Sequence, residues 1–318
     1  MKSNKQRVDY KYIISTYGII IALIALLAVV SIMNKNFWVF RNIINILRIT
    51  SINGLLAIGM TLVILTGGID LSVGAIMGTA GMVSAYFARE TMGLPMIVAV
   101  SAGLAVGFLC GIINGLLISR LNVPAFVGTL GMSSIATGIT YIISDAKPIS
   151  KLTSSFKFLG TGAFLGLPIP LWIIAVIAIA AFLLLYRLPI GRYIFAIGGN
   201  EEATFASGVS TKRVKFSVYV FSALLAALSG VIMTARVSSG VVTTGTGYET
   251  EAIAAVVIGG TSLAGGKGRL WGSLVGVLVL TILNNILDLL AVNSYLQLVF
   301  KGIIIICAVL IDSLSNNN

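Results

Sequence analysis

The chain has 318 residues, of which 58% are hydrophobic and 10% are charged, and its formal net charge at pH 7 is +11. Because soluble globular domains carry about 25% charged residues, this composition excludes an ordinary soluble protein. We attribute the positive charge to basic residues beside apolar segments, where they meet anionic membrane lipid, and we expect no nucleic-acid partner.

Apolar runs of about 20 residues recur along the chain and are long enough to cross a hydrocarbon core of ~30 Å. They lack the strict alternation of barrel strands, so we expect helices. The sequence predicts an all-α fold, a polytopic transmembrane helical bundle that forms one domain over residues 1–318. About ten spans are expected, at residues 13–33, 51–66, 73–88, 95–119, 124–143, 171–186, 216–235, 252–263, 270–291 and 295–311.

The basic residues are unevenly distributed between the segments that connect these spans. If the N-terminus is cytoplasmic, the cytoplasmic segments contain more lysine and arginine than the outer ones, as the positive-inside rule requires. The basic N-terminal residues then precede an uncleaved first helix. This orientation places the charged segment 188–215 in the cytoplasm and the segment 144–170 outside the cell.

Two glycine-rich motifs are similar to each other, GGIDLSVG at 67–74 and GGTSLAGG at 259–266. Asn114 and Asn122 stand eight residues apart, as do Asn285 and Asn293. Duplicated halves with glycine-interrupted spans are typical of transporters, so we predict an internal duplication. The alternative is chance matching among the 35 glycines of the chain.

Glycines recur every four residues on one side of the expected fourth span. They are Gly103, Gly107, Gly111 and Gly115. Small residues at this interval let helix backbones approach closely inside a membrane. We therefore expect this side of the helix to pack against a neighbouring helix.

The segment 188–215 is a polar island between apolar spans. Gly198 and Gly199 interrupt the chain, Asn200 is a suitable N-cap for a short helix over residues 201–207, and Gly208 ends that helix. Such a helix suits the groove of a partner protein, whereas the alternative is an ordinary solvated loop. The candidate docking residues are Gly198, Gly199, Asn200, Glu201, Glu202, Phe205, Ser207 and Gly208.

Six polar residues fall inside or beside apolar spans, where they are costly and therefore typical of solute pathways. They are Asp70, Asn114, Asn284, Asp288, Gln297 and Lys301. Amide and carboxylate groups of this kind bind sugar hydroxyls. A purely structural alternative is that Lys301 neutralises Asp288 on the preceding helix.

The sequence offers no catalytic or metal site. A phosphate-binding loop of the form G-x-x-x-x-G-K-[ST] needs glycine where Thr261 stands and a hydroxyl residue where Gly268 stands, so this chain alone is not expected to bind or hydrolyse ATP. Histidine is absent, and Cys110 and Cys307 both lie in apolar runs. We expect neither a cofactor nor a metal on this chain.

Several blocks of the sequence resemble the permease subunits of bacterial ABC importers for simple sugars. AIGGNEEATFASGV is similar to the cytoplasmic coupling segment of that family, and TLVILTGGIDLSVG, GTGYETEAIAAVVIGGTSLAGGKG and NNILDLLAVNSYLQLVFKGIIIICAVL are similar to its other characteristic blocks. The resemblance covers residues 36–312. Glu202 and Phe205 depart from the residues that are common in the family at those positions, which concerns the identity of the ATPase more than the mechanism.

The resemblance implies a multi-pass permease subunit of the cytoplasmic membrane, paired with a second copy as a homodimer. It implies a separate cytosolic ATPase that binds ATP and Mg and docks on the segment 188–215. It also implies an extracytoplasmic binding protein that delivers the sugar, with ribose or a related monosaccharide as the favoured cargo.

Two other functions are compatible with parts of the pattern. An ion-coupled secondary sugar transporter would suit duplicated halves equally well, and Asp70 or Asp288 would then hold the ion. An intramembrane enzyme would need convergent catalytic groups, and the chain has no histidine and no suitably spaced pair of carboxylates.

Overall fold

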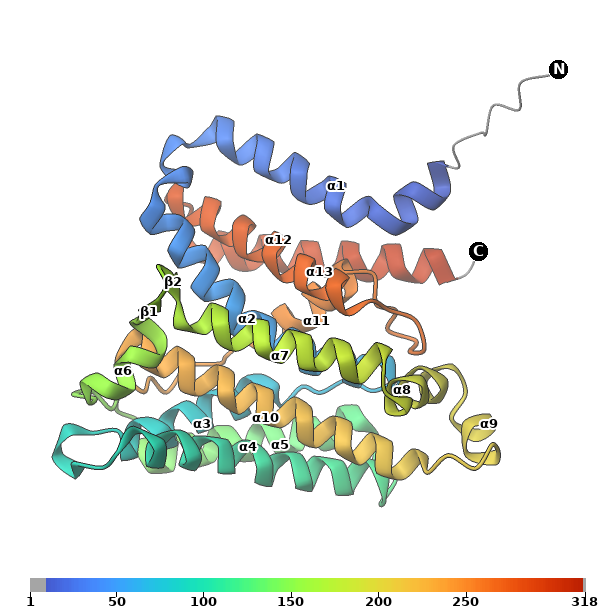
Figure 1. Cartoon of the computed structure of the whole chain (residues 1–318), viewed down its shortest axis with the longest axis horizontal. Helices are drawn as coiled ribbons and strands as arrows, with labels where there is room; N and C mark the ends of the chain where they lie inside the picture. Colours follow the sequence, from blue (N-terminus) through green and yellow to red (C-terminus); the bar gives the residue numbers. More distant parts are fainter. Residues whose placement is uncertain (1–9, 317–318) are drawn as a thin grey trace.

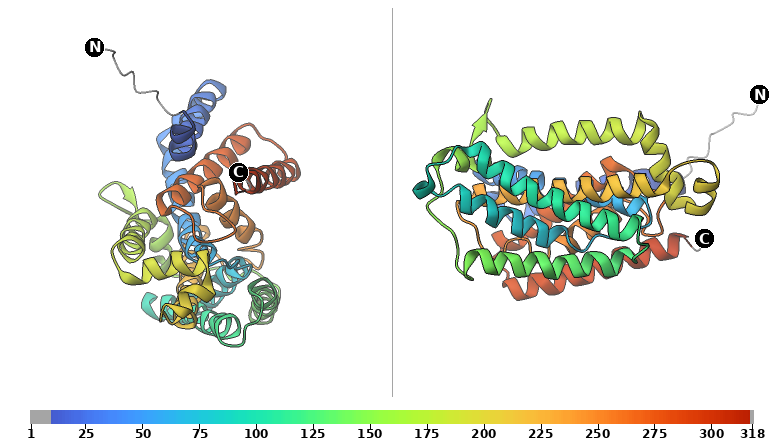
Figure 2. Two further views of the ribbon diagram at one scale, coloured as in Figure 1. Left: turned by 90° about the vertical axis from the view of Figure 1, so that its right-hand side faces the viewer. Right: turned by 90° about the horizontal axis from the view of Figure 1, so that it is seen from below.

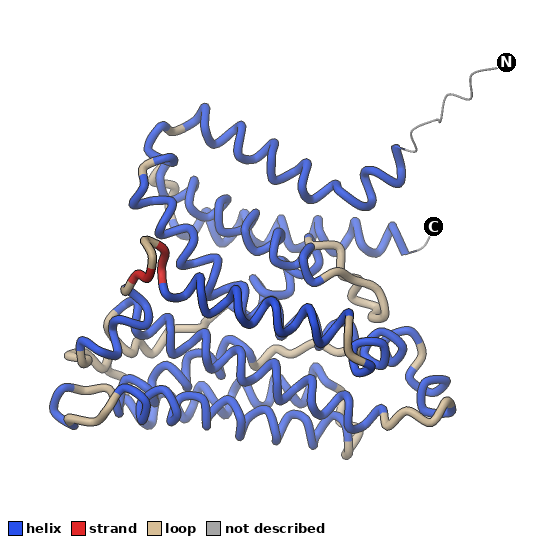
Figure 3. The backbone as a smooth tube through the Cα atoms, viewed as in Figure 1, coloured by secondary structure: helices blue, strands red, loops and turns tan. Residues whose placement is uncertain are grey.

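The computed structural model describes residues 10–316, and almost all of the regular structure in that range is helical (Figure 3). The basic N-terminal residues 1–9 lie outside the described residues. The α-helices are α1 (Tyr10–Met33), α2 (Phe40–Leu65), α3 (Val73–Phe87), α4 (Met96–Ser119), α5 (Ala125–Ser144), α6 (Ser154–Thr161), α7 (Ile169–Tyr186), α8 (Pro189–Gly199), α9 (Glu201–Ala206), α10 (Thr211–Val237), α11 (Tyr248–Ile258), α12 (Leu270–Leu289) and α13 (Ser294–Asn316).

Proline marks where several of these helices begin. Pro95, Pro124 and Pro168 stand directly before α4, α5 and α7, and Pro189 is the first residue of α8. Proline is tolerated at a helix start because the N–H that it lacks has no intrahelical partner there. Two short 3-10 helices, η1 (Lys35–Trp38) and η2 (Glu90–Met92), and a two-residue antiparallel pair, β1 (Ala163–Phe164) with β2 (Leu167–Pro168), complete the elements.

The described residues contain six helices that are long and apolar enough to cross a membrane: α2, α4, α5, α7, α10 and α12. The all-α membrane bundle predicted from the sequence is confirmed, but the expected number of ten spans is not established. The main departure is α11, which has 11 residues and is therefore only about 16 Å long. The apolar run in 252–263 thus includes a half-length helix instead of a full span.

α2 begins at Phe40, well before the expected start at residue 51. The additional turns contain Arg41 and Arg48, which the sequence prediction placed in the segment before the span. Arg48 Nη2 donates a hydrogen bond to the carbonyl oxygen of Thr161 at 2.7 Å. The helix tolerates these arginines because their charged groups reach polar surroundings at the end of the bundle.

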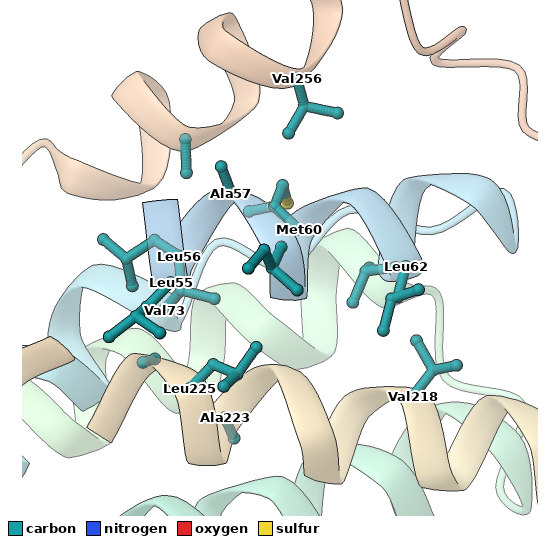
Figure 4. Packing of buried hydrophobic residues seen from close by; sticks show 14 of the residues in the cluster. Leu55, Leu56, Ala57, Met60, Leu62, Val73, Val218, Ala223, Leu225 and Val256 are labelled. Carbon is teal, nitrogen blue, oxygen red and sulfur yellow. The ribbon is translucent and has the colours of Figure 1, made fainter. Parts of the chain in front are cut away.

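α2 and α10 form the centre of the bundle and run antiparallel. Ser229 Oγ of α10 donates to the carbonyl oxygen of Ile52 at 3.0 Å, while Gly59 packs against Ser222. Figure 4 shows Leu55 and Met60 of α2 in the apolar core with side chains from α3, α10 and α11. This burial of apolar side chains between helices fixes the position of α2.

The remaining helices form two groups around this centre. The end-on view in Figure 2 shows α1, α12 and α13 on one side of α2, and α3, α4 and α5 on the other. α8 and α9 lie at one end of the bundle, which we call the α9 end, and α6 with the β1–β2 hairpin lies at the opposite end (Figure 1). The first described turn of α1 and the last turn of α13 also lie toward the α9 end.

Candidate functional site

The polar segment 188–215 contains the two short helices α8 and α9 and the first turn of α10. Of the two short helices, only α9 was predicted from the sequence. α8 buries Ile194 and Ile197 on one face. The apolar spacing of Ile190, Ile194 and Ile197 is the helical period of an amphipathic segment and would have revealed α8. It was missed because the many charges of the segment indicated a loop.

The predicted short helix at 201–207 is confirmed as α9. Asn200 Oδ1 accepts a hydrogen bond from the backbone N–H of Ala203 at 2.8 Å, which is N-cap geometry. Gly208 follows the helix with φ of 87°, a left-handed conformation that strains residues with a Cβ. The cap and the terminating glycine fix both ends of a helix that is too short to be stable alone.

One face of α9 packs against the bundle, and the other face is exposed to solvent. Thr204 is buried, and Lys215 Nζ of α10 contacts Glu201 Oε2 at 2.9 Å. Glu202 and Ser207 are exposed, and Phe205 as a whole residue is 66% exposed. An exposed aromatic ring on a rigid helix at the end of a bundle is a suitable anchor for a partner's pocket. The docking role of these residues stays a prediction.

Three glycine-rich segments meet beside α8 at the α9 end. The backbone N–H of Gly266 donates to the carbonyl oxygen of Leu65 at 3.1 Å. A Cβ on Gly198 would collide with those same two groups, and one on Gly265 would approach Gly67 and Gly198 too closely. Three chain segments can therefore touch here only because these positions carry no side chain. We call this contact the glycine junction.

The two similar motifs, 67–74 and 259–266, are thus neighbours in space. Their places in the two parts of the chain differ, because the first follows α2 and the second follows the half-length α11. α10 and α11 repeat the order of α2 and α3, a long helix followed by a shorter one. The segment between α10 and α11 is 238–247, and it contains Gly245 with φ of 95°. The sequence predicted an internal duplication from the similarity of the two motifs, but it did not predict that the motifs would be neighbours in space.

Asp70 and Asn114 lie in one buried polar cluster. Asp70 Oδ1 accepts hydrogen bonds from the N–H of Ser72 at 2.9 Å and from its Oγ at 2.5 Å, and Asn114 Nδ2 donates to Ser72 Oγ at 2.9 Å. Ser222 Oγ of α10 lies 3.5 Å from Asp70 Oδ2. Asp70 and Asn114 are both fully buried. This arrangement holds the non-helical segment 66–72, between α2 and α3, against α4 and α10.

Three of the four polar residues predicted in α12 and α13 take part in two separate contacts. Lys301 Nζ forms an ion pair with Glu251 of α11, so the expectation that it neutralises Asp288 is wrong. Asp288 Oδ1 instead accepts a hydrogen bond from Gln297 Nε2 at 3.0 Å. Asn284 lies beside the ion pair in a small pocket that Glu251 and Lys301 also line. Glu251 was not singled out from the sequence because its partner lies 50 residues away.

The glycines of α4 pack as predicted. Gly103, Gly107, Gly111 and Gly115 are all buried, and a Cβ on any of them would collide with a neighbouring helix. At Gly107 the obstacles are the carbonyl oxygen of Ala223 and the methyl group of Ala227, both on α10. The whole face of α4 is therefore in close contact, mainly with α10.

A polar hollow at the opposite end of the bundle was not predicted. Its volume is about 750 Å³, and its lining includes Arg41, Arg48, Asn45 and Arg236. Arg236 Nη2 donates to Asn45 Oδ1 at 2.8 Å. The recurrence of basic residues seven apart on α2, at Arg41 and Arg48, is the signal in the sequence that could have indicated it.

The sequence is similar to a known protein family and to individual proteins of known function. Residues 42–309 match the family described as branched-chain amino acid transport system / permease component. The chain is 45% identical to the ribose import permease protein of Escherichia coli (strain K12) over 92% of both chains. It is 43% identical to the ribose import permease protein of Bacillus subtilis (strain 168), over 98% of this chain and 97% of that one.

A relative with another sugar in its name also matches. The chain is 36% identical to the D-allose transport system permease protein of Escherichia coli (strain K12), over 98% of this chain and 96% of the relative. No solved structure matches the chain.

Proposed function

Because the chain belongs to the branched-chain amino acid transport system / permease component family, we propose that it is the membrane-spanning subunit of an ATP-driven importer for a simple sugar. A permease of this family is a transport component and not an enzyme. The structural observation that carries the proposal is α9, a capped helix that presents the exposed ring of Phe205 at one end of an otherwise apolar bundle.

The favoured cargo is ribose or a related monosaccharide. The relatives at 43% and 45% identity are ribose import permeases, and the relative at 36% is a D-allose permease. Similarity over more than nine-tenths of the chain supports a shared class of cargo. The chain's similarity to sugar-import permeases also supports a location in the cytoplasmic membrane with several passes.

The partners follow from the division of labour in such importers. We infer a homodimer of this subunit, two copies of a cytosolic ATPase that hold ATP and Mg, and an extracytoplasmic binding protein. Phe205 and Glu202 lie on the free face of α9 and are the residues that we assign to the ATPase contact. The α9 end then faces the cytoplasm, together with the N-terminus, and α6 with the β1–β2 hairpin faces outside.

The glycine junction is the route by which movement of α9 reaches the membrane helices. Gly198 and Gly199 precede the N-cap of α9; Gly198 lies against both Leu65 at the end of α2 and Gly266 in the loop before α12, and Gly199 lies beside Gly266. Since this contact is made by backbone atoms packed without side chains, a displacement of α8 and α9 shifts both groups of helices together. ATP-driven closure of the ATPase thereby switches the pathway between an outward-open and an inward-open state.

The order of the elements supports an inverted duplication. A long helix, a break and a short helix occur in α2 and α3, and again in α10 and α11, while α2 and α10 run in opposite directions. Inverted repeats with broken helices are frequent in transporters, and their binding sites lie near the breaks. On this view α3 and α11 are the incomplete members of a ten-segment arrangement.

The polar residues divide into two roles in this scheme. Asn284 and Lys301 line a pocket between helices and are candidates for the sugar pathway. Asp70 and Asn114 hold the break at 66–72, and Asp288 with Gln297 joins α12 to α13. Ion coupling has no specific support, because Asp70 and Asp288 both accept hydrogen bonds from neighbouring side chains.

The docking role of α9 is tested by Phe205→Ser in the full-length permease embedded in nanodiscs. We expect binding of the importer's ATPase to weaken by more than tenfold, because a buried aromatic anchor of an interface contributes about 2 kcal/mol or more. Phe164→Ser is the matched control, since Phe164 is similarly exposed but lies at the opposite end. Equal ATPase affinity for Phe205→Ser and the unaltered protein would refute the assignment.

A further inference from the structure

A second cavity, of about 540 Å³, opens at the α9 end. It lies between α9, the adjacent ends of α4 and α10, and the non-helical segment that follows α2. Cavities of a few hundred Å³ hold small molecules in many proteins. Glu202 at its rim is assigned above to the ATPase contact, but the inner lining formed by Tyr219 and Ser119 has no role in the proposed function. Its lining is predominantly polar and comes from four separate segments of the chain.

Two hydroxyl groups in the lining have no hydrogen-bond partner among the described residues. They are Tyr219 Oη of α10 and Ser119 Oγ, the last residue of α4. Tyr219 is 0% exposed and Ser119 is 3% exposed, and both line the cavity. The Tyr219 hydroxyl lies against Gly68, where a Cβ would collide with it. Buried hydroxyls are normally satisfied, so two unsatisfied ones at one cavity indicate a missing polar ligand.

The charges of the lining favour a ligand without net charge. The lining contains two carboxylates, of Glu201 and Glu202, and two ammonium groups, of Lys212 and Lys215. The Glu201 and Lys215 groups already neutralise each other at 2.9 Å. An anion such as a phosphorylated sugar would meet both carboxylates in the same lining. A neutral molecule with several hydroxyl groups can use all of these groups as donors and acceptors at once.

We propose that this cavity is a binding site for a neutral monosaccharide that enters from the α9 end. The inference rests on the proposed function, which supplies a sugar on that side of the membrane as the product of import. Tyr219 Oη and Ser119 Oγ bind hydroxyl groups of the sugar. Because Glu201 of α9 is part of the same lining, a bound sugar contacts the docking helix and the transmembrane helices simultaneously.

The experiment measures sugar binding to the full-length permease in nanodiscs by calorimetry, without ATPase or binding protein. Ribose, allose and ribose 5-phosphate are the probes. We expect one of the neutral sugars to bind and ribose 5-phosphate to bind more weakly. Tyr219→Phe and Ser119→Ala should each lower the affinity about three- to tenfold, which corresponds to one hydrogen bond. Tyr295→Phe, at an exposed tyrosine on α13, is the matched control.

Thermal unfolding of the same variants separates a binding role from a structural one. Removing a hydroxyl that has no partner should not lower the midpoint of unfolding, so Tyr219→Phe should be as stable as the unaltered protein. A clearly lower midpoint for Tyr219→Phe, a preference for ribose 5-phosphate, or unchanged sugar affinity in both variants would overturn the proposal.

Transport by the assembled importer distinguishes this inference from the proposed function. If the importer accumulates a sugar that the permease alone does not bind, the cavity is not a sugar site and the proposed function stands. If neither binding nor transport is found for any neutral sugar tested, both fail. Binding by the permease with loss on Tyr219→Phe supports the site.

Discussion

At the scale of single residues, Lys301 and Glu251 make the most informative contact. The pair of Lys215 with Glu201 joins α10 to α9 at the end of the bundle, whereas the Lys301–Glu251 ion pair joins α11 and α13. Both side chains are largely shielded from solvent. An ion pair in such surroundings fixes the relative position of two helices more than it adds net stability. It therefore defines how the half-length α11 is held against α13.

Removing either partner alone should destabilise the protein. Lys301→Met or Glu251→Gln leaves one unpaired charge among apolar side chains, and we expect each change to lower the free energy of unfolding by about 1–3 kcal/mol. The double variant removes both charges and should recover most of the loss. Unfolding by denaturing detergent, followed for the four proteins, provides this double-mutant cycle. Losses that simply add in the double variant would show that the pair is not coupled.

The sequence could predict the type of these residues but not their partners. Lys301 and Asp288 share neighbouring apolar segments, which made their pairing reasonable. The structure instead brings α11 against α13, so that Glu251 reaches Lys301 and Asp288 is left to Gln297. Contacts between helices depend on how each helix is rotated about its axis, and spacing within one helix does not determine that rotation.

At the scale of elements, the glycine face of α4 shows how the bundle assembles without a hydrophobic drive between helices. α4 and α10 approach until backbone and methyl atoms touch, at Gly107 and along the whole face. In lipid, close packing of this kind supplies the association energy. Exclusion of side chains from that face is thus a requirement of the fold.

Gly107→Leu should prevent folding of the bundle, because the added side chain would displace α10 by several ångströms. We expect the yield of protein that is monodisperse in detergent to fall to a small fraction of the unaltered yield. Gly138→Leu is the matched control, because Gly138 lies in helix α5 with open space around it. A normal yield of folded Gly107→Leu protein would contradict the close packing.

Helix α9 and the α4 face were predictable because their signals are local. A cap, a terminating glycine and a four-residue period are all contained in a few consecutive residues. The half-length α11 was not predictable, because hydrophobicity reports apolar surroundings and does not distinguish lipid from the interior of a protein. The glycine junction required three distant segments and was visible only as two similar motifs.

At the scale of the whole molecule, composition alone was enough for the fold class. A chain with 58% hydrophobic and 10% charged residues has too little polar surface for a soluble fold. The number of spans was less certain, since breaks such as 66–72 and 238–247 divide long segments inside the bundle. The two groups of helices on either side of α2 (Figure 2) follow from contacts that no composition reveals.

We propose different roles for the two ends of the bundle. The α9 end carries helix α9, the glycine junction and the cavity beside Tyr219. The opposite end carries the hollow lined by Arg48 and Arg236. In our account a separate ATPase acts on the first end, while sugar arrives at the second, and the bundle itself supplies no energy.

Uptake of radiolabelled ribose into proteoliposomes tests this central claim most directly. Vesicles that contain the permease, its ATPase and its binding protein should accumulate the sugar above the external concentration only when ATP is supplied on the ATPase side. Vesicles that contain the permease alone should show no accumulation under any proton or sodium gradient. Accumulation of ribose by the permease alone, abolished by an ionophore, would contradict the account.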